Sequence, residues 1–309
     1  MVYEYTEDIA QRLPTVLHET LGCHVRSVER LLSGQVTYAF RVETDDGPLL
    51  AKVFRYAHVP RRATAPFVGE SLARVGVRHA ETRYFDESDA YFPHGFLVDE
   101  WITGPLVSDA LKEGHLSRDA FCASVAAVLR RVHAVRFDAF GIPPLRSADE
   151  RFPDFVAFMR SQDQIGELQA LIDAGKADAA LITAGQERLN RCYAAIDFPV
   201  QPVLVHGDPS GDNVIQTADG LVLIDWDNAN VSSWVHDLAW LTFWYGPEAY
   251  APFMRGYGAT DEDEAHIRTL ETAFHTRLAL QLPLYFAFAL GDDTMTAWAI
   301  KRLQDMIAR

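Results

Sequence analysis

Hydrophobic and polar positions alternate with two different periods in the first part of the chain. Apolar residues have helical spacing over 7–21, and the period changes to two from Val25 to Phe54. A period near 3.6 is typical of an amphipathic helix, and a period of two is typical of strands with one buried face. The pattern predicts a helix followed by three antiparallel strands. These strands are 25–32, 38–43 and 49–54, with turns at 33–35 and 44–47.

The later part of the chain has mainly helical spacing. Helices are expected over 116–135, 152–172 and 176–196. The apolar segment from Leu278 to Leu290 is shorter than the roughly 18 residues that a membrane helix needs. It is interpreted as a buried helix.

A short strand, a polar loop and a hairpin are expected between residues 203 and 226. The strand is Val203 to Val205, and the runs 214–216 and 221–224 pair across a turn that contains Gly220. A hairpin returns the chain to its starting point. The polar residues at its two ends are therefore expected to meet.

Those polar residues carry oxygen atoms suited to phosphoryl transfer. Asn213 stands where the hairpin begins, and Asp225 stands twelve residues later, where it ends. Together they can hold a hard cation such as Mg²⁺, which prefers oxygen ligands. Asp208, in the adjoining loop, is left as a separate carboxylate to receive a hydroxyl proton.

The charge and cysteine content of the chain restrict its expected binding partners and cellular location. The 309 residues carry 28 basic and 43 acidic side chains, a formal charge of −15. Nucleic-acid binding needs basic patches, so a nucleic-acid partner is not expected, and a cationic or neutral partner is favoured. The acidic N-terminus, Met1 to Asp8, lacks the pattern of a secretory signal. With no membrane span and three widely spaced cysteines, Cys23, Cys122 and Cys192, a cytoplasmic protein with reduced thiols is expected.

Four motifs in order and spacing resemble the aminoglycoside phosphotransferase family, and within it the run from Tyr285 to Asp293 is most similar to the hygromycin and macrolide kinases. The four motifs are His206-Gly207-Asp208, Asn213, Ile224-Asp225-Trp226 and Asp237-Leu238-Ala239. Two positions differ from the family pattern: Ser210 replaces a frequent second His, and Ser232-Ser233-Trp234 replaces Gly-Asp-Pro.

The resemblance implies an α+β, bilobal, protein-kinase-like fold. The N-terminal nucleotide-binding lobe would be 1–104, with a hinge at 99–104, and the helical C-terminal lobe would be 105–309. ATP or GTP with Mg²⁺ is the expected cofactor pair.

The resemblance also implies roles for single residues in the first lobe. Ser33 and Gly34 would cover the nucleotide phosphates, and Lys52 would contact the α- and β-phosphates. Glu70 is the first candidate for the carboxylate partner of Lys52, with Glu81 as the alternative. The backbone at Glu100 and Ile102, in the hinge, would bind the adenine ring.

In the second lobe, the resemblance makes Asp208 the catalytic base and Asn213 and Asp225 the Mg²⁺ ligands. His206 and Asp237 would support the loop. An alternative interpretation, a metal phosphohydrolase, rests on His206, Asp208 and the pair His236-Asp237, and another is a pseudokinase that binds nucleotide without turnover.

The acceptor is expected to be a small molecule with a hydroxyl group, and the net charge favours a cationic one. An aminoglycoside-type antibiotic is the first choice, and a choline- or homoserine-like alcohol, a sugar or another natural product is the alternative. Candidate contacts are Asp212, Asp227, Asp292 and Asp293. The acidic run 260–264 is interpreted as a helix cap rather than an amine site, with Thr260 as the capping residue. The oligomeric state, monomer or dimer, stays open.

Overall fold

The computed structural model describes residues 7–32, 37–55, 64–145 and 147–308. Its contacts divide the chain into two compact units. The first unit contains residues 1–117, 142–146 and 208–230. The second contains residues 118–141, 147–207 and 231–309. The expected lobe boundary at residue 104 stays a prediction, and the segment 208–230 groups with the sheet by its contacts.

A five-stranded antiparallel sheet is the centre of the first unit, in the order β1-β2-β3-β5-β4. The strands are β1 Val25–Leu31, β2 Thr37–Thr44, β3 Gly47–Phe54, β4 Thr82–Asp86 and β5 Phe96–Glu100. The three predicted strands correspond to β1, β2 and β3. The mixed α and β class is therefore confirmed.

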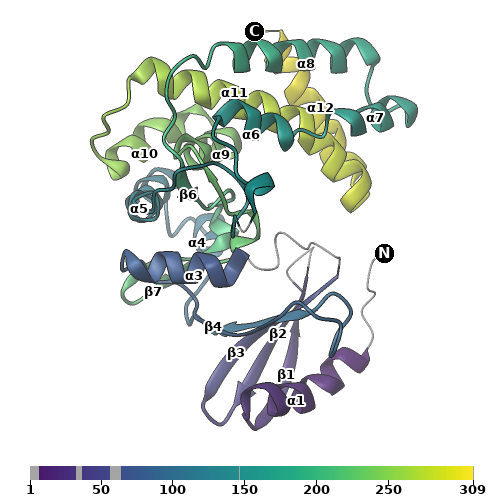
Figure 1. Cartoon of the computed structure of the whole chain (residues 1–309), viewed down its shortest axis with the longest axis vertical. Coiled ribbons are helices and arrows are strands. Elements are labelled where there is room, and N and C mark those ends of the chain that lie inside the picture. Colours follow the sequence, from purple (N-terminus) through teal and green to yellow (C-terminus); the bar gives the residue numbers. More distant parts are fainter. Residues whose placement is uncertain (1–6, 33–36, 56–63, 146, 309) are drawn as a thin grey trace. The chain divides into compact units, whose positions relative to one another are not determined.

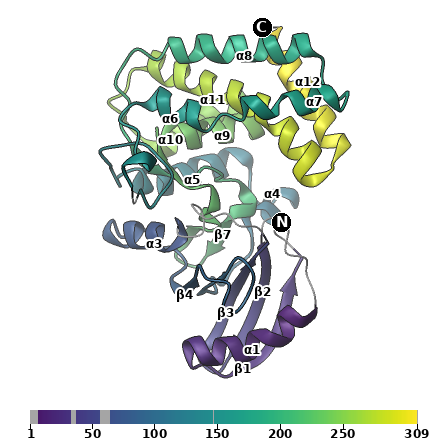
Figure 2. The same ribbon diagram turned by 45° about the vertical axis from the view of Figure 1, so that its right-hand side comes forward.

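Helix α1 (Glu7–Leu21) covers one face of this sheet (Figure 1, Figure 2). Ile9, Leu13 and Leu17, spaced four residues apart, are fully buried against the strands. Phe40 and Phe96 are also fully buried in this core. Burying a Leu or Phe side chain stabilises a fold by roughly 1.5–3 kcal/mol. The predicted helical period of residues 7–21 thus matches the face that is buried.

Two short helices and a hairpin complete the first unit. They are α3 Thr64–Arg74, α4 Val107–Lys112 and the strands β7 Val214–Thr217 and β8 Gly220–Leu223. Gly104, after β5, passes so close to β7 that a Cβ there would lie 2.2 Å from the carbonyl oxygen of Gln216. Gln216 N in turn donates to Pro105 O at 3.0 Å. The end of the predicted hinge is therefore packed against the hairpin.

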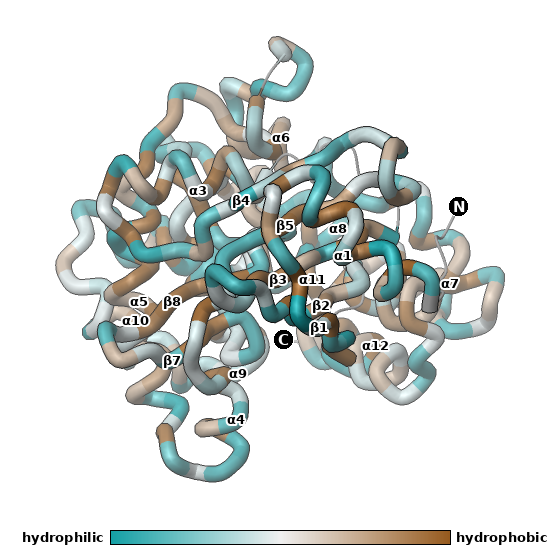
Figure 3. Tube along the Cα trace, turned by 90° about the horizontal axis from the view of Figure 1, so that it is seen from below, coloured by the Kyte–Doolittle hydropathy of each residue, from teal (hydrophilic) through white to brown (hydrophobic). Residues whose placement is uncertain are grey.

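The second unit is mainly helical, with α11 packed against α8, α9 and α12 (Figure 1). Its helices are α5 Arg118–Val132, α6 Phe155–Ser161, α7 Gln169–Asp173, α8 Ala179–Ala194, α9 Val235–Tyr245, α10 Tyr250–Tyr257, α11 Glu264–Leu284 and α12 Asp293–Ile307. Strand β6 Val203–Val205 pairs with β9 Asn230–Ser232. Hydrophobic and hydrophilic residues are interspersed along the elements of both units (Figure 3), as expected where helices and strands bury one face.

Two local predictions were wrong, and the helix expected over 278–290 is present with a change of hydrogen-bond period. Residues 152–172 form the two short helices α6 and α7 instead of one, because Asp154 caps α6 and the chain turns at Gln162. The segment 278–290 is the end of α11 followed by a π-helix, Tyr285–Leu290. At the start of α11, Asp263 accepts a hydrogen bond from Ala265 N at 2.7 Å, so the N-cap is Asp263 and not Thr260.

No helix in the described ranges is both long enough and apolar enough to span a membrane. The three cysteines Cys23, Cys122 and Cys192 are free thiols.

Candidate active site

The hairpin brings its two ends together as predicted. Val214 pairs with Leu223, and Ile224 N donates to the carbonyl oxygen of Asn213 at 2.9 Å. Asp225 is the next residue along the chain. Asn213 and Asp225 therefore lie on neighbouring positions at the open end of the hairpin.

The loop before the hairpin is folded back on itself. Asn213 Nδ2 donates to the backbone carbonyl of Asp208 at 3.0 Å, and Asn213 N donates to Ser210 O at 2.9 Å. Gly211 packs against α4, where a Cβ would lie 3.1 Å from Ser108 N. These contacts hold the amide of Asn213 with its nitrogen toward Asp208, which directs its oxygen the other way.

Asp225 has an unusual backbone conformation, with φ 61° and ψ 65°. Left-handed conformations are uncommon for residues other than glycine, and Asp and Asn tolerate them better than most. Such residues are concentrated at functional sites. The turn at Asp225 ends β8 and begins the short helix Trp226–Asn228.

Lys52 is paired with Asp225. Its Nζ lies 3.0 Å from Asp225 Oδ1, and its side chain is 13% exposed. Burial alone would lower the pKa of Lys52, but the negative charges of Asp225, Asp227 and Asp99 raise it above its ordinary value. The ammonium group is therefore charged at neutral pH and joins the sheet to the hairpin within the first unit.

Asp99 is a member of this cluster that the sequence interpretation assigned only to the hinge backbone. Its carboxylate is buried and accepts a hydrogen bond from Thr82 Oγ1 at 2.9 Å. Burial raises the pKa of Asp99 to about 6, against the opposing effect of Lys52. In the strand register Asp99 lies opposite Leu50, two residues before Lys52, so the two side chains share one face of the sheet.

The cluster offers oxygen atoms of the kind that Mg²⁺ prefers. Asp225 contacts the ammonium group of Lys52, and Asp227 and Asp99 act on it through their negative charge. The carboxylate of Asp225 is 45% exposed, which leaves it accessible as an oxygen ligand beside the amide of Asn213. Asn213 and Asp225 would hold the metal, and their ligand roles stay a prediction.

The structure does not bring Glu70 to Lys52. Among the described residues, Glu70 pairs with Arg74 at 3.9 Å and its side chain is 73% exposed. The alternative, Glu81, pairs with Arg83 at 3.3 Å. The carboxylate that pairs with Lys52 is that of Asp225, a residue on the hairpin rather than on the helix after Pro66. The pairing of Glu70 or Glu81 with Lys52 therefore stays a prediction.

The hinge residues are ordered, whereas the predicted phosphate loop is not described. Glu100 forms an ion pair with Arg78, with 2.9 Å between Arg78 Nη1 and Glu100 Oε2, and Ile102 is buried. The N–H of Glu100 also donates to Glu81 O at 2.8 Å, so the carbonyl of Glu100 and the backbone of Ile102 are the groups left for a nucleotide. Ser33 and Gly34 lie outside the described residues.

His206 and Asp237 meet in the second unit. The carboxylate of Asp237 accepts from His206 N at 2.9 Å and from Gly207 N at 2.8 Å. Where the family pattern has Gly-Asp-Pro, Ser233 Oγ accepts from Val235 N at 3.2 Å at the start of α9. The loop-supporting role assigned to Asp237 is compatible with this geometry and stays a prediction.

Asp237 is occupied by these contacts, which does not suit a metal ligand. Its neighbour His236 stacks on Phe274, with 4.5 Å between the ring centroids. In the part of the chain that the structure describes, no three His, Cys, Asp or Glu side chains are grouped to hold a metal ion. The phosphohydrolase interpretation stays an alternative that these contacts do not favour.

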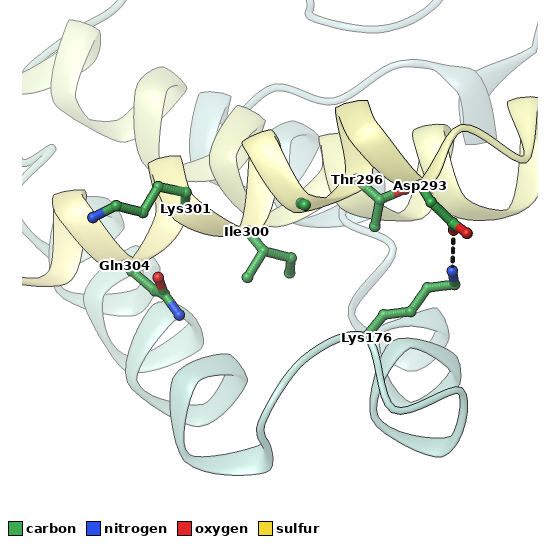
Figure 4. Close-up of a pocket in the computed structure, with 7 residues that line it drawn as sticks. Lys176, Asp293, Thr296, Ile300, Lys301 and Gln304 are labelled. Carbon is green, nitrogen blue, oxygen red and sulfur yellow. Dashed lines mark hydrogen bonds and ion pairs between the residues drawn. The ribbon is translucent and has the colours of Figure 1, made fainter.

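The four candidate acceptor contacts have different surroundings. Asp212 is exposed and 4.0 Å from Lys112, and Asp227 lies near enough to Lys52 to affect its charge. Asp292 caps α12 by accepting from Met295 N at 2.9 Å. Asp293 pairs with Lys176 at 2.5 Å in a shallow hollow of about 490 Å³ along α12 (Figure 4). Of the four, only Asp227 acts on the charge of Lys52.

Comparison with known proteins agrees with this geometry. The model of the phosphotransferase enzyme family (APH) matches residues 27–268, well over half of the chain. No curated protein sequence matches.

Three solved structures share the fold. A thermostable mutant of aminoglycoside phosphotransferase APH(4)-Ia, in a ternary complex with AMP-PNP and hygromycin B, is similar with TM-score 0.72 and 18% identity, over 97% of this chain and 98% of that one. A candidate fructosamine-3-kinase from Thermobifida fusca YX-ER1 has TM-score 0.64 and 18% identity, over 97% and 100%. Macrolide 2'-phosphotransferase type I has TM-score 0.63 and 17% identity, over 98% and 99%.

These similarities confirm the kinase-like α+β fold that the motifs predicted. The chain belongs to the phosphotransferase enzyme family and is a small-molecule phosphotransferase that acts on a hydroxyl group.

Proposed function

We propose that the protein transfers the γ-phosphate of ATP or GTP to a hydroxyl group of a small molecule. The acceptor that we propose first is an aminoglycoside-type antibiotic. The observation that carries the proposal is the ion pair between Lys52 and Asp225, at 3.0 Å, beside the hairpin end that holds Asn213. A lysine on a strand and oxygen ligands on a hairpin are the parts that phosphoryl transfer uses.

In this proposal Asp208 accepts a hydrogen bond from the acceptor hydroxyl. An alcohol has too high a pKa to be ionised beforehand, so Asp208 positions the hydroxyl and takes its proton late in the transfer. The catalytic gain then comes from positioning and from electrostatic stabilisation of the transferring group.

Mg²⁺ would supply positive charge beside the nucleotide phosphates when bound. Asn213 and Asp225 hold it, and Lys52 neutralises further phosphate charge. Asp225 would exchange part of its contact with Lys52 for the metal. The carbonyl of Glu100 and the backbone of Ile102 would bind the purine ring, because both side chains are engaged elsewhere.

The acceptor class is supported in two directions. A structural neighbour was solved with hygromycin B and another with spectinomycin, which favours an antibiotic acceptor. Two other neighbours are described as candidate fructosamine-3-kinases, which keeps a sugar-like acceptor as the second choice. The formal charge of −15 favours an acceptor that carries amino groups in either class.

An acceptor screen tests the proposal. The purified protein is incubated with Mg²⁺ and ATP or GTP, and release of the nucleoside diphosphate is measured with hygromycin B, spectinomycin, a macrolide, a glycated amine, choline or homoserine. We expect one class to stimulate release at least tenfold over the acceptor-free rate. Omission of Mg²⁺ should remove that stimulation. Nucleotide binding without stimulation by any hydroxyl compound would support a pseudokinase instead.

A further inference from the structure

We propose that His133 and Tyr257 are positioning residues for phosphoryl transfer, which act on the loop before Asp208 through the carboxylate of Asp237. This inference rests on the proposed function, in which Asp208 positions the acceptor hydroxyl. His133 directly follows α5 and Tyr257 is the last residue of α10, both far from the loop in sequence, and no motif singles them out.

Asp237 determines how the backbone enters the loop. Its two carboxylate oxygens accept from His206 N at 2.9 Å and from Gly207 N at 2.8 Å, and these are the last two amides before Asp208. Gly207 has a left-handed backbone, with φ 82°. A rotation or shift of the carboxylate would therefore change the direction of the peptide that leads into Asp208.

The carboxylate is itself held by His133. Both side chains are almost fully buried, with 2% and 0% of their surface exposed, and His133 Nε2 lies 3.0 Å from Asp237 Oδ2. A carboxylate in this state only accepts hydrogen bonds, so Nε2 of His133 must carry the hydrogen. Removing this donor would leave a buried carboxylate with one partner fewer, which is costly in the protein interior.

Tyr257 fixes the histidine from its other side. Its hydroxyl lies 3.1 Å from His133 Nδ1 and can donate to that nitrogen when Nε2 carries the hydrogen. The tyrosine ring stacks on Trp234 with 4.5 Å between centroids, and its backbone carbonyl accepts from Arg130 Nη1 at 2.8 Å. The stacked ring and the hydrogen-bonded backbone of Tyr257 therefore fix the position of the hydroxyl group beside His133.

The contacts link Tyr257 to the loop through His133 and Asp237. The charge state of Asp237 is consistent with these contacts. Burial alone would raise the pKa of Asp237, but the hydrogen bond from His133 and the nearby His206 and His236 hold that pKa below its ordinary value. Asp237 is therefore ionised and able to accept all three hydrogen bonds.

Three variants test the inference. His133→Leu removes the donor at similar size, His133→Gln replaces the ring by an amide that can still donate, and Tyr257→Phe removes only the hydroxyl. We expect kcat to fall about 10-fold or more in His133→Leu with the nucleotide KM nearly unchanged, because misplacement of a reacting group acts on the transition state. His133→Gln should regain most of that loss. Tyr257→Phe should lower kcat about 2- to 10-fold, the range of one neutral hydrogen bond.

Two readouts do not depend on turnover. Hydrogen exchange of the peptide that contains residues 203–208 should be faster at the amides of His206 and Gly207 in His133→Leu and in Tyr257→Phe. Nitrogen NMR of the histidines should show His133 with its hydrogen on Nε2 in the wild type. Val125→Ala, in the helix that precedes His133 and fully buried but without polar side-chain contacts, is the matched control for lost packing. It should lower stability and leave both kcat and loop exchange unchanged.

The outcomes separate this inference from the proposed function. Equal loop exchange and equal kcat in Tyr257→Phe and the wild type would overturn the inference, even if His133→Leu does not fold. So would a loss in His133→Leu that Val125→Ala reproduces. If Asp208→Asn keeps turnover, the proposed function fails instead, whatever the exchange of the loop shows.

Discussion

Lys52 is in direct contact with Asp225, and the charges of Asp227 and Asp99 also act on it. The carboxylate of Asp225 is 45% exposed, and the backbone of Asn213 is joined to the neighbouring Ile224. Carboxylate and amide oxygens are ligands that Mg²⁺ prefers. This pair of oxygen-bearing side chains is the residue-scale reason to expect Mg²⁺ at Asp225 and Asn213.

The metal role can be tested at Asp225 itself. Asp225→Asn removes the charge but keeps a side chain that tolerates the left-handed backbone, so the fold should survive. We expect Mg²⁺ to tighten nucleotide binding in the wild type and to lose this effect in Asp225→Asn, and to keep part of it in Asn213→Ala, which removes a neutral ligand. Calorimetric titration of nucleotide with and without Mg²⁺ measures this. Equal losses in both conditions would contradict a metal role.

A second residue-scale prediction concerns acid stability. Burial lowers the pKa of His236 to about 4 in the folded state, whereas the ordinary pKa of a histidine, as in the unfolded state, is near 6.5. The folded state therefore binds this proton only at a lower pH than the unfolded state does. The stability that this contributes is present above about pH 6.5 and is lost as the pH falls toward 4.

His236→Phe keeps a ring to stack on Phe274 and removes the titration. Urea unfolding at pH 7.5 and at pH 4.5 should show that wild type loses more stability on acidification than His236→Phe, by about 1–3 kcal/mol. The same pH dependence in both proteins would mean that His236 is not responsible.

At the scale of elements, α5 and α10 pack unusually closely. A Cβ on Gly256 would lie 1.9 Å from the carbonyl oxygen of Ala123, so only glycine fits at this crossing. The contact brings Tyr257, the next residue, to His133 at the end of α5. Helix packing and the loop-positioning contacts are therefore linked.

Gly256→Ala should be destabilising although alanine is the better helix former. The backbone contact cannot yield without separating the two helices, and we expect a loss of about 2 kcal/mol or more in the free energy of unfolding. Gly69→Ala is the control, because its Cβ would meet only His79 at 3.4 Å and helix propensity should favour it by up to about 1 kcal/mol. Urea unfolding of both variants decides it; a harmless Gly256→Ala would show that the helices can adjust.

At the scale of the whole molecule, the charge of −15 bears on the acceptor. Asp227 is the carboxylate nearest the Lys52 cluster among the candidates, whereas Asp293 already has Lys176 as a partner. If the acceptor is a polyamine, its ammonium groups should be held by such carboxylates in a salt-dependent way.

The cationic acceptor predicts a KM that rises with salt, because exposed charge pairs are screened with a Debye length of about 8 Å at physiological ionic strength. Asp227→Asn should raise the KM of the acceptor, and because Asp227 also acts on Lys52 it should lower kcat as well. Asp293→Asn should raise it less. Asp45→Asn, a change of equal charge in the turn before β3, is the control. If neither salt nor Asp227→Asn changes the KM of the acceptor, the negative net charge of the chain would serve solubility alone.

The limits of sequence-based prediction follow from the range of each contact. The strands and the hairpin depend on local periodicity, and a hairpin brings its own two ends together. The sequence was therefore sufficient to predict these elements and the meeting of Asn213 with Asp225. The partner of Lys52, Asp225, is 173 residues away, and His133 meets Tyr257 across 124 residues. Such pairings depend on how separate elements pack, which is why the sequence indicated neither the contact of Lys52 with Asp225 nor that of His133 with Tyr257.

The central claim is that Asp208 receives the proton of the acceptor hydroxyl, and Asp208→Asn tests it most directly. Steady-state kcat with the acceptor found in the screen should fall about 10²-fold or more, because the variant keeps the shape of the side chain and loses its basicity. Nucleotide affinity and the unfolding transition should stay as in the wild type, and Asp219→Asn, in the exposed turn of the hairpin, should keep full turnover. Near-normal turnover in a folded Asp208→Asn protein would contradict the account.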